Sequence, residues 1–360
     1  MNFTSRLLQW YNKNQRELPW RDTKDPYKIW LSEIILQQTR IAQGIQYYYR
    51  FVEKFPNVES LTAATEDEVL SLWQGLGYYS RARNLHETAK TIVSNHNGRF
   101  PETYNELLAL KGIGPYTAAA IASIAFGKNF ATVDGNVSRV IARYFLIIEP
   151  IDDNNTQKQI KKIAADLIDP ENPGMFNQAM MDLGATVCKP GKPLCNICPI
   201  NEDCEARMKG IENELPLKKN KVKIKERFFH FLFICREGNN KKEFFVEKRQ
   251  DNDIWKNLYQ LPLIETSGVF LSDEGFKEHP LILSLQANGF DLWPGGKSYR
   301  FEHLLTHQRI YAFFHVIPLP ADDISGTDDT FQWVDFETFS EMGKPVLINK
   351  FFRKYLSAQK

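Results

Sequence analysis

The sequence predicts an all-α domain over residues 1–210, a basic linker over 211–227 and a smaller mixed α/β domain over 228–360. Three observations support this division. A length of 360 residues is typical of two domains. Apolar residues recur at helical spacings in the first part, whereas short runs of aromatic and β-branched residues follow the linker. Four of the five cysteines crowd into residues 188–204, where the helical pattern ends.

The helices expected in the first domain are separated by short Gly, Pro or Asn breaks. Phe3, Leu7, Trp10 and Tyr11 form one amphipathic stripe near the N-terminus. The next helix is apolar nearly all round, which predicts that it is buried. Gly75 and Gly77 divide a longer helical stretch in two. The expected helical segments after the first stripe are 27–39, 66–93 with that break, the residues after 114, 134–146, 156–168 and 176–188.

The second domain is expected to alternate strands and turns before a final helix. Asn239 and Asn240 supply a turn between the first two expected strands. An amphipathic tail over 346–356 predicts a helix. The expected strands are 228–236, 242–249, 309–317 and 330–336.

Composition limits the class of protein. The net charge is +1, so any nucleic-acid surface must be a local patch. No stretch approaches the ~18 apolar residues of a membrane span, and the first residues lack the apolar core of a signal peptide. We therefore expect a soluble, cytoplasmic protein with no membrane partner. In a reducing compartment, clustered cysteines indicate a metal site rather than disulfides.

The cysteine cluster reads CKPGKPLCNICPINEDC, with Cys188, Cys195, Cys198 and Cys204 spaced C-x6-C-x2-C-x5-C. Four thiols in one short segment predict a metal centre. Zinc sites usually pair two short C-x2–4-C knuckles, and only one close pair is present here. Four cysteines can also hold a [4Fe–4S] cluster. The spacing leaves both open and favours iron–sulfur only slightly.

The segment LKGIGPYTAAAIA, residues 110–122, places two glycines before a run of strong helix formers. Gly112 and Gly114 permit backbone angles that other residues avoid. They expose backbone N–H groups at a helix N-terminus, where an anion such as a DNA phosphate can bind. An ordinary turn between two helices is the alternative. A dinucleotide-binding loop is not indicated, because no strand precedes the segment and the third glycine is missing.

Two carboxylates are candidates for acid–base chemistry. Glu33 lies among Ile29, Trp30 and Leu36 at helical spacings, and burial raises the pKa of a carboxyl group towards that of a general acid. The alternative for Glu33 is an exposed or salt-bridged side chain. Asp134 stands just before a helix, as an N-cap, a catalytic group or both. Cleavage of a glycosidic bond uses such a pair, because one carboxyl group protonates the leaving group and the other stabilises the sugar cation.

These motifs, with LPWR, SEIILQQT, GLGYYSRARN and FNQAMMDLGA, are similar to the adenine-specific (MutY-type) members of the helix-hairpin-helix DNA glycosylase superfamily. The similarity covers nearly all of residues 1–210. It implies a helix-hairpin-helix at about 105–125 and one structural [4Fe–4S] cluster held by the four cysteines. It also implies that a monomeric enzyme removes adenine opposite 8-oxoguanine or guanine in duplex DNA, in base excision repair.

The resemblance also implies roles for single residues. Glu33 would protonate adenine at N7 and help to activate water, and Asp134 would stabilise the sugar cation or bond to it. Asn136 and Tyr116 would position these groups. The adenine pocket would be lined by Trp20, Arg21, Leu36 and Gln178.

Removal of a base requires that it be flipped out of the duplex. By the resemblance, Gln38 and Tyr78 would fill the gap that the base leaves, a role that side chains take in kinked DNA. Further DNA contacts would come from Thr39, Gly112, Gly114, Lys189 and Lys192.

Tyr116 separates two kinds of glycosylase. In relatives that resemble endonuclease III, a lysine at this position attacks the sugar as an amine and then cuts the strand. Tyrosine cannot form a Schiff base, so this chain is expected to remove the base and leave the backbone whole. A bifunctional pyrimidine glycosylase-lyase is therefore one alternative function. A non-catalytic iron–sulfur DNA-binding protein is another, opposed by the presence of both Glu33 and Asp134.

The second domain resembles a Nudix hydrolase fold that reads 8-oxoguanine in this family. The stretch FEHLLTH, Phe301–His307, carries Thr306 where a serine is usual and Leu305 where an aromatic is usual. Thr306 and His307 are therefore the expected lesion-reading residues. No Glu-rich motif that would hold Mg²⁺ around a pyrophosphate is found in this domain, which argues against a nucleotide hydrolase.

Overall fold

The computed structural model describes residues 2–219, 224–237, 241–250, 253–269, 273–290, 292, 297–320 and 331–358. The chain forms two compact units. Residues 1–63 and 84–221 make up the first unit, and residues 64–83 and 222–360 the second. No helix among the described residues is long and apolar enough to cross a membrane.

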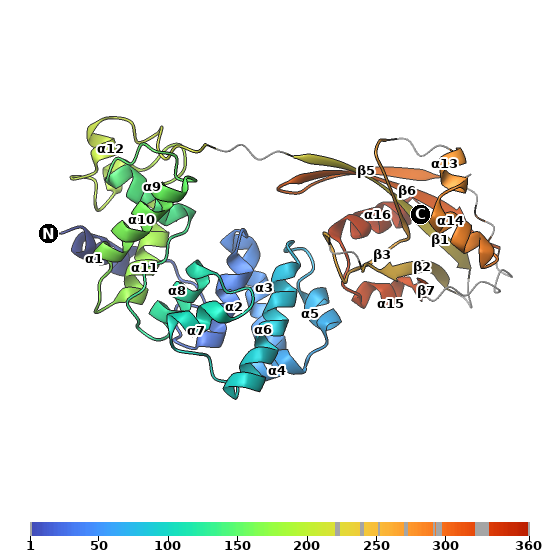
Figure 1. The fold of residues 1–360 in the computed structure, drawn as a ribbon, viewed down its shortest axis with the longest axis horizontal. Coiled ribbons are helices and arrows are strands. Elements are labelled where there is room, and N and C mark those ends of the chain that lie inside the picture. The colour runs from blue at the N-terminus through green and yellow to red at the C-terminus, as the bar shows by residue number, and fades with distance from the viewer. Residues whose placement is uncertain are drawn as a thin grey trace. The chain divides into compact units, whose positions relative to one another are not determined.

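The first unit is helical (Figure 1). Its helices are α1 (Phe3–Asn14), α2 (Pro26–Leu36), α3 (Ile41–Lys54), α4 (Val58–Ala63), most of α6 (Ser80–His96), α7 (Tyr104–Ala109), α8 (Pro115–Ile124), α9 (Gly135–Tyr144), α10 (Asn154–Leu167), α11 (Pro173–Asp182) and α12 (Glu205–Met208). A π-helical turn, Leu183–Val187, continues α11, and a 3₁₀ turn, Cys195–Ile197, lies among the cysteines.

Local sequence explains where the helix that carries Glu33 begins. The Asp25 side chain accepts a hydrogen bond from the Tyr27 backbone N–H at 2.9 Å and so caps α2. Pro26 follows at the first helical position, where its missing N–H costs nothing. The helix is buried on most of its circumference, as the sequence predicted. It ends at Leu36 rather than at residue 39, because the backbone of Gln38 turns to φ 52°.

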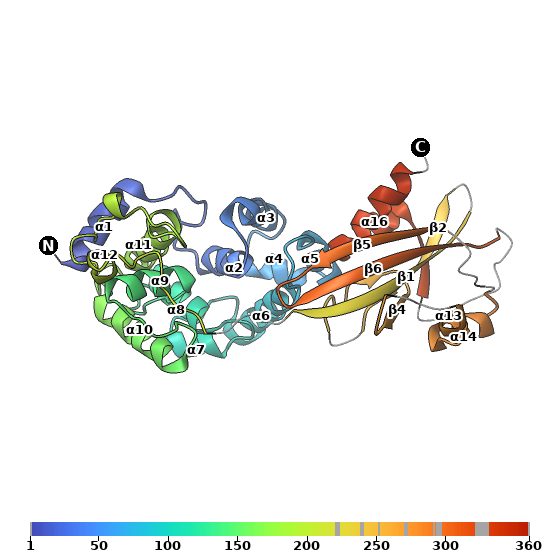
Figure 2. The ribbon, with the colours of Figure 1, turned by 90° about the horizontal axis from the view of Figure 1, so that it is seen from above.

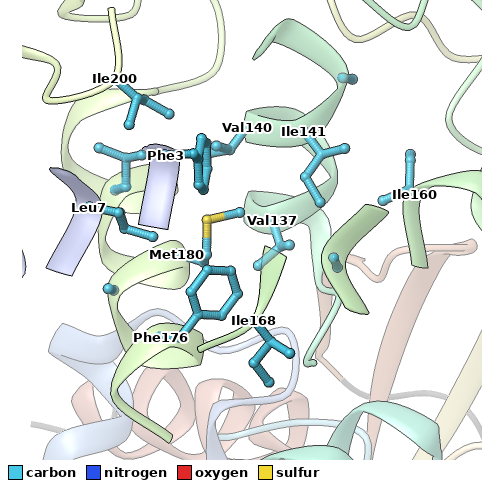
Figure 3. Close-up of a cluster of buried hydrophobic side chains, with 14 of the residues drawn as sticks. Phe3, Leu7, Val137, Val140, Ile141, Ile160, Ile168, Phe176, Met180 and Ile200 are labelled. Carbon is cyan, nitrogen blue, oxygen red and sulfur yellow. The ribbon is translucent and has the colours of Figure 1, made fainter. Parts of the chain in front are cut away.

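An apolar core joins the two ends of the first unit's sequence. Phe3 and Leu7 of α1 pack with Val140 of α9 and Met180 of α11 (Figure 3). Ile200, from the cysteine segment, joins the same cluster. Burial of these side chains supplies the main hydrophobic stabilisation between α1, α9 and α11. The N-terminal helix is therefore part of the frame that holds the cysteine segment.

The expected hairpin lies between α7 and α8, and only one of its two glycines needs a special backbone angle. Gly112 has φ 75°, and a Cβ there would lie 2.7 Å from the Cβ of Asn84. Gly114 has φ −89° and ψ 176°, an extended conformation that any residue adopts. Gly114 therefore does not use the backbone freedom that its residue type permits. It serves as the N-cap of α8, before Pro115, which has no N–H to offer an anion.

The second unit is built on one mixed sheet. Within the described residues its strands are β1 (Lys225–Glu237), β2 (Lys242–Lys248), β3 (Tyr259–Gln260), β4 (Leu263–Thr266), β5 (Ser298–Leu304), β6 (Gln308–Pro318) and β7 (Phe331–Asp335). The order is β3-β2-β1-β6-β5, with β4 paired to β1 and β7 to β2. Only β1 and β6 run parallel among these pairs, with Phe231 opposite Phe314.

Helices cover both faces of this sheet (Figure 2). On one face, Phe351 of α16 (Val346–Ser357) stacks on Phe314 with ring centroids 4.3 Å apart. On the other face, Ile282 of α14 (Pro280–Ala287) packs with Leu232 and Phe245. Two short helices, α13 (Asp273–Lys277) and α15 (Phe336–Glu341), complete the layers. The expected classes, a helical domain and a mixed β-sheet domain, are both confirmed.

Residues 64–83 contribute α5 (Glu66–Leu72) to the second unit. The Asn257 side chain donates to Glu66 at 2.6 Å, and Lys248 forms a 2.6 Å ion pair with Asp67. Gly343 allows close packing, since a Cβ there would lie 3.1 Å from the Cβ of Leu70.

Several elements of the second unit differ from expectation. The first strand begins at Lys225, inside the expected linker, and β3, β4, β5, α13 and α14 were not predicted at all. The sequences of β3, β4, α13 and α14 are short, so periodicity alone gives little signal for them, whereas β5 was missed although Tyr299 and Phe301 alternate with polar residues. The expected turn at Asn239–Asn240 lies outside the described residues.

Candidate active site

A cavity of about 940 Å³ lies in the helical unit. Its walls come from the loop before α2, from α2 and the turn after it, from the start of α8, from the N-terminus of α9 and from α11. The structure thus brings together the expected catalytic and base-binding residues. The expected residues in the lining are Trp20, Arg21, Glu33, Leu36, Gln38, Thr39, Tyr116, Asp134, Asn136 and Gln178.

Glu33 projects from α2 into this cavity. Its backbone neighbours Ser32 and Ile34 are buried. The pKa of Glu33 is raised to about 7, which is the net result of four effects. Burial and the nearby Asp134 carboxyl group raise it, whereas the hydrogen bond with Tyr116 and the Arg21 guanidinium lower it. Desolvation is the largest of these effects. Near neutral pH, Glu33 can therefore hold a proton and give it up.

Tyr116 stands on the first turn of α8, between the two carboxyl groups. Its hydroxyl oxygen lies 3.0 Å from the Met181 sulfur and within hydrogen-bond reach of Glu33. Burial, together with the charges of Glu33 and Asp134, raises the pKa of Tyr116 well above its usual value. The phenol stays protonated, so it can orient a carboxyl group but cannot act as an amine nucleophile.

Asp134 is the N-cap of α9 and also faces the cavity. One carboxylate oxygen accepts from the Val137 backbone N–H at 2.7 Å, and the other accepts from Asn136 Nδ2 at 2.8 Å. Two donors therefore fix the orientation of this carboxylate. A glycine is required nearby, since a Cβ on Gly184 would lie 2.6 Å from the Cβ of Asn136.

Arg139 connects this cap to the cysteine segment. Its Nη2 donates to Asn136 Oδ1 and to the Gly184 carbonyl oxygen, both at 2.8 Å. Its Nε donates to the Cys188 carbonyl oxygen at 2.8 Å. Sequence reasoning missed Arg139, although its position one turn after Asn136 on α9 was readable.

A second group that the sequence reasoning missed is an ion-pair network behind the cavity wall. Asp182 is fully buried and accepts two hydrogen bonds from Arg21, both at 2.6 Å. Arg16 also donates to Asp182, through Nε at 2.8 Å and through Nη2. The signal available was a carboxylate one helical turn after Gln178, on the same face of α11.

Gln178 is held by a buried phenol. Tyr11 Oη donates to Gln178 Oε1 at 2.8 Å, so the amide oxygen is occupied. The Arg21 guanidinium lies over the Tyr11 ring, 5.6 Å from its centroid. Trp20 is fixed in the same wall by edge-on contact with Tyr48, at 5.2 Å between ring centroids. Contacts with buried tyrosines therefore hold the expected base-binding side chains in place.

The two expected wedge residues share an unusual backbone. Gln38 has φ 52° and Tyr78 has φ 47°, a region that non-glycine residues rarely occupy. Such strain is often found at functional sites. Gln38 and Thr39 border the cavity, whereas Tyr78 belongs to the second unit and is 43% exposed.

Thr306 and His307 occupy the tip of the hairpin between β5 and β6, where both are exposed. The Leu305 backbone N–H donates to the Gln308 carbonyl oxygen at 2.8 Å and closes the turn. The Thr306 hydroxyl is hydrogen-bonded to the Tyr78 hydroxyl within the second unit. Lys189 and Lys192 are exposed on the loop between the first two cysteines and do not border the cavity.

The four cysteines Cys188, Cys195, Cys198 and Cys204 border one small apolar cavity in the helical unit. Burial raises the pKa of the Cys198 thiol to about 12. The Arg143 guanidinium lies behind the site, with Nη1 3.3 Å from Cys188 Sγ. Among the described residues, no group of three or more His, Cys, Asp or Glu side chains is arranged to hold a metal ion.

Comparisons with known proteins agree with this geometry. Residues 31–169 match the family model described as HhH-GPD superfamily base excision DNA repair protein, and residues 232–354 match a NUDIX domain. An adenine DNA glycosylase from Buchnera aphidicola (subspecies Baizongia pistaciae) is 33% identical over 98% of this chain and 96% of its own length. The human adenine DNA glycosylase is 45% identical over 59% of this chain and 41% of its own length.

Solved structures match the helical part. A thermostable thymine-DNA glycosylase is 34% identical and superposes with a TM-score of 0.54, covering 57% of this chain and 95% of that one. An endonuclease III, solved in a non-covalent complex with DNA, shares the fold at a TM-score of 0.50. With the near full-length match, the paired domains and the cavity, the chain belongs to the adenine DNA glycosylase family, base excision repair hydrolases that act on N-glycosidic bonds.

Proposed function

We propose that this enzyme hydrolyses the N-glycosidic bond of adenine mispaired with 8-oxoguanine or guanine in duplex DNA, and that it leaves the sugar–phosphate backbone intact. One observation carries the proposal. Glu33, with a pKa of about 7, and the capped carboxylate of Asp134 face the same cavity. A proton donor and a carboxylate are the two groups that cleavage of a glycosidic bond requires.

In this mechanism Glu33 donates its proton to N7 of a flipped adenine. The bond between the base and C1′ of the sugar then breaks, with its electron pair leaving on the protonated base. Water adds to C1′ and gives up a proton to the Glu33 carboxylate, which restores the acid. The products are free adenine and an abasic site.

Asp134 stabilises the sugar while it carries positive charge. The two N–H donors hold the carboxylate on one face of the cavity, and the Asn136 amide that supplies one of them is itself anchored by Arg139. A carboxylate that is already oriented costs no reorganisation when charge develops.

The base-binding wall combines aromatic, apolar and amide groups. Trp20 and Leu36 offer flat and aliphatic surface for a purine, and Gln178 offers its amide nitrogen because Tyr11 occupies the oxygen. Gln38 and Tyr78 are proposed to fill the space left by the base, and Thr39, Gly112, Gly114, Lys189 and Lys192 are proposed to contact the DNA.

We also propose one structural [4Fe–4S] cluster held by Cys188, Cys195, Cys198 and Cys204. Their shared apolar cavity and the adjacent Arg143 guanidinium fit a cluster with anionic thiolate ligands. When bound, the cluster supplies no chemistry to the base. It fixes the segment whose Cys188 carbonyl group anchors Arg139.

Iron content tests this assignment. Protein purified anaerobically is expected to be brown and to contain about four irons per chain, because four thiolates suit that cluster. The measurement is metal analysis together with the absorbance spectrum. Stoichiometric zinc without iron would reject the cluster.

Glu33→Gln is expected to bind DNA but to lose base excision by about 10²–10⁴-fold, because the amide cannot donate the proton. The wild-type single-turnover rate is expected to fall as pH rises through about 7, as the acid form of Glu33 is lost. The exposed Glu53→Gln, on α3, is the control. A Glu33→Gln rate within tenfold of wild type below pH 7, where the acid form of Glu33 predominates, would contradict this role.

Three duplexes test the function as a whole: A opposite 8-oxoguanine, A opposite guanine, and an oxidised pyrimidine. We expect excision only from the first two, and strand breaks only after added alkali, since Tyr116 offers no amine. Tyr116→Lys should gain some strand cutting, whereas Tyr116→Phe should not. Efficient borohydride trapping of the wild type on DNA would rule out a monofunctional enzyme, because only an imine is reduced in that way.

The hairpin tip is the proposed reader of the opposite base. 8-Oxoguanine differs from guanine by an N7 hydrogen and an 8-oxo group, and a hydroxyl beside a ring nitrogen can sense both, a contact worth ~1–3 kcal/mol. Thr306→Ala with His307→Ala is expected to lower the ratio of excision rates for 8-oxoguanine over guanine opposite adenine. Leu304→Ala, at a 60% exposed neighbour, is the control. An unchanged ratio in the double variant would show that the lesion is sensed elsewhere.

A further inference from the structure

The cavity that contains Glu33 has a strongly cationic lining. Arg16, Arg21, Arg40 and Arg139 border it, and Asp134 is the one carboxylate beside Glu33 in that lining. A positive charge nearby favours the ionised form of a carboxyl group and therefore lowers its pKa. If no negative charge opposed this lining, it would lower the pKa of Glu33, and Glu33 would lose its proton.

One buried carboxylate opposes this field from behind the wall. Asp182 has no exposed surface, and both of its oxygens accept hydrogen bonds from Arg21 in a bidentate pair. Arg16 donates to the same carboxylate through its side chain, and through its backbone N–H at 3.3 Å. One negative charge therefore directly faces two of the four guanidinium groups.

We propose, on the basis of the function proposed for Glu33, that Asp182 is a positioning residue that holds Arg21 in the wall and partly offsets its charge, so that Glu33 remains a proton donor. The Arg21 guanidinium also lies over the Tyr11 ring as a cation–π contact while it donates to Asp182. Burial disfavours the charge of Asp182, but the hydrogen bonds from Arg21 and Arg16 outweigh this and lower its pKa. The carboxylate is therefore charged at every pH at which Glu33 titrates.

The other groups that face Glu33 act independently of Asp182. Tyr116 on α8 forms a hydrogen bond with Glu33, and Asp134 at the start of α9 raises the pKa of Glu33. Of the three groups described here as facing Glu33, only Arg21, from the loop before α2, forms an ion pair with Asp182. A change at Asp182 should therefore reach Glu33 through Arg21.

Asp182→Asn is the test, because it keeps the size of the side chain and removes its charge. The midpoint of the single-turnover pH–rate profile is expected to move down by about one pH unit, with the rate at low pH retained. A purely structural role would lower the rate equally at every pH and leave the midpoint in place. Glu265→Gln, which breaks a similar bidentate pair with Arg227 in the second unit, should leave the midpoint unchanged.

The double variant Arg21→Gln with Asp182→Asn removes both charges and is expected to return the midpoint towards that of the wild type. It also covers the case in which two unpaired guanidinium groups prevent Asp182→Asn from folding. Circular dichroism checks the fold of each variant. A midpoint that is equal in the wild type, in Asp182→Asn and in the double variant would overturn the inference.

A second measurement is independent of catalysis. In protein labelled with ¹³C at Glu carboxyl groups, the Glu33 signal is the one that Glu33→Gln removes, and its titration gives the pKa of the free enzyme. A lower pKa in Asp182→Asn supports the inference even if no duplex is cleaved, and an unchanged pKa refutes it. If the wild type excises adenine from no duplex, the proposed function fails, whatever this titration shows.

Discussion

The desolvation of Glu33 is the constraint on which the site depends. Glu33 can stay protonated near neutral pH chiefly because it is desolvated, with a smaller contribution from the charge of Asp134, and α2 provides that setting because it is buried on most of its circumference. Asp25 and Pro26 start the helix, and the left-handed turn at Gln38 ends it. The apolar packing of α2 and the raised pKa of Glu33 thus have the same physical origin.

Helix α9 links this chemistry to the rest of the helical unit. Its first residues orient Asp134, its middle carries Arg139, and its last turn carries Arg143 beside Cys188. The apolar face of the same helix packs in the core with Phe3 and Met180. Motion of the cysteine segment would therefore reach the cap of α9 through hydrogen bonds and packing together.

Much of the molecule could be read from the sequence because the signals are local. Helical periodicity gave α2, α5, α6 and α9–α11, and the capping role of Asp134 followed from its place before a helix. The short strands β3 and β4 and the helices α13 and α14 have no such signal, whereas the alternation in β5 was overlooked. Gly112 behaved as its residue type indicates, whereas Gly114 took an ordinary extended conformation, since a glycine permits a positive φ but does not require one.

The sequence alone determined the residue types of the site, namely two carboxylates, a tyrosine in place of an amine, and four clustered cysteines. Only the tertiary structure decided how they act on one another. The pKa of Glu33 depends on Tyr116, Asp134 and Arg21, and Arg21 depends on the buried charge of Asp182, all from different segments. Electrostatic effects depend on distance and on the exclusion of water, and neither quantity is fixed until the chain has folded.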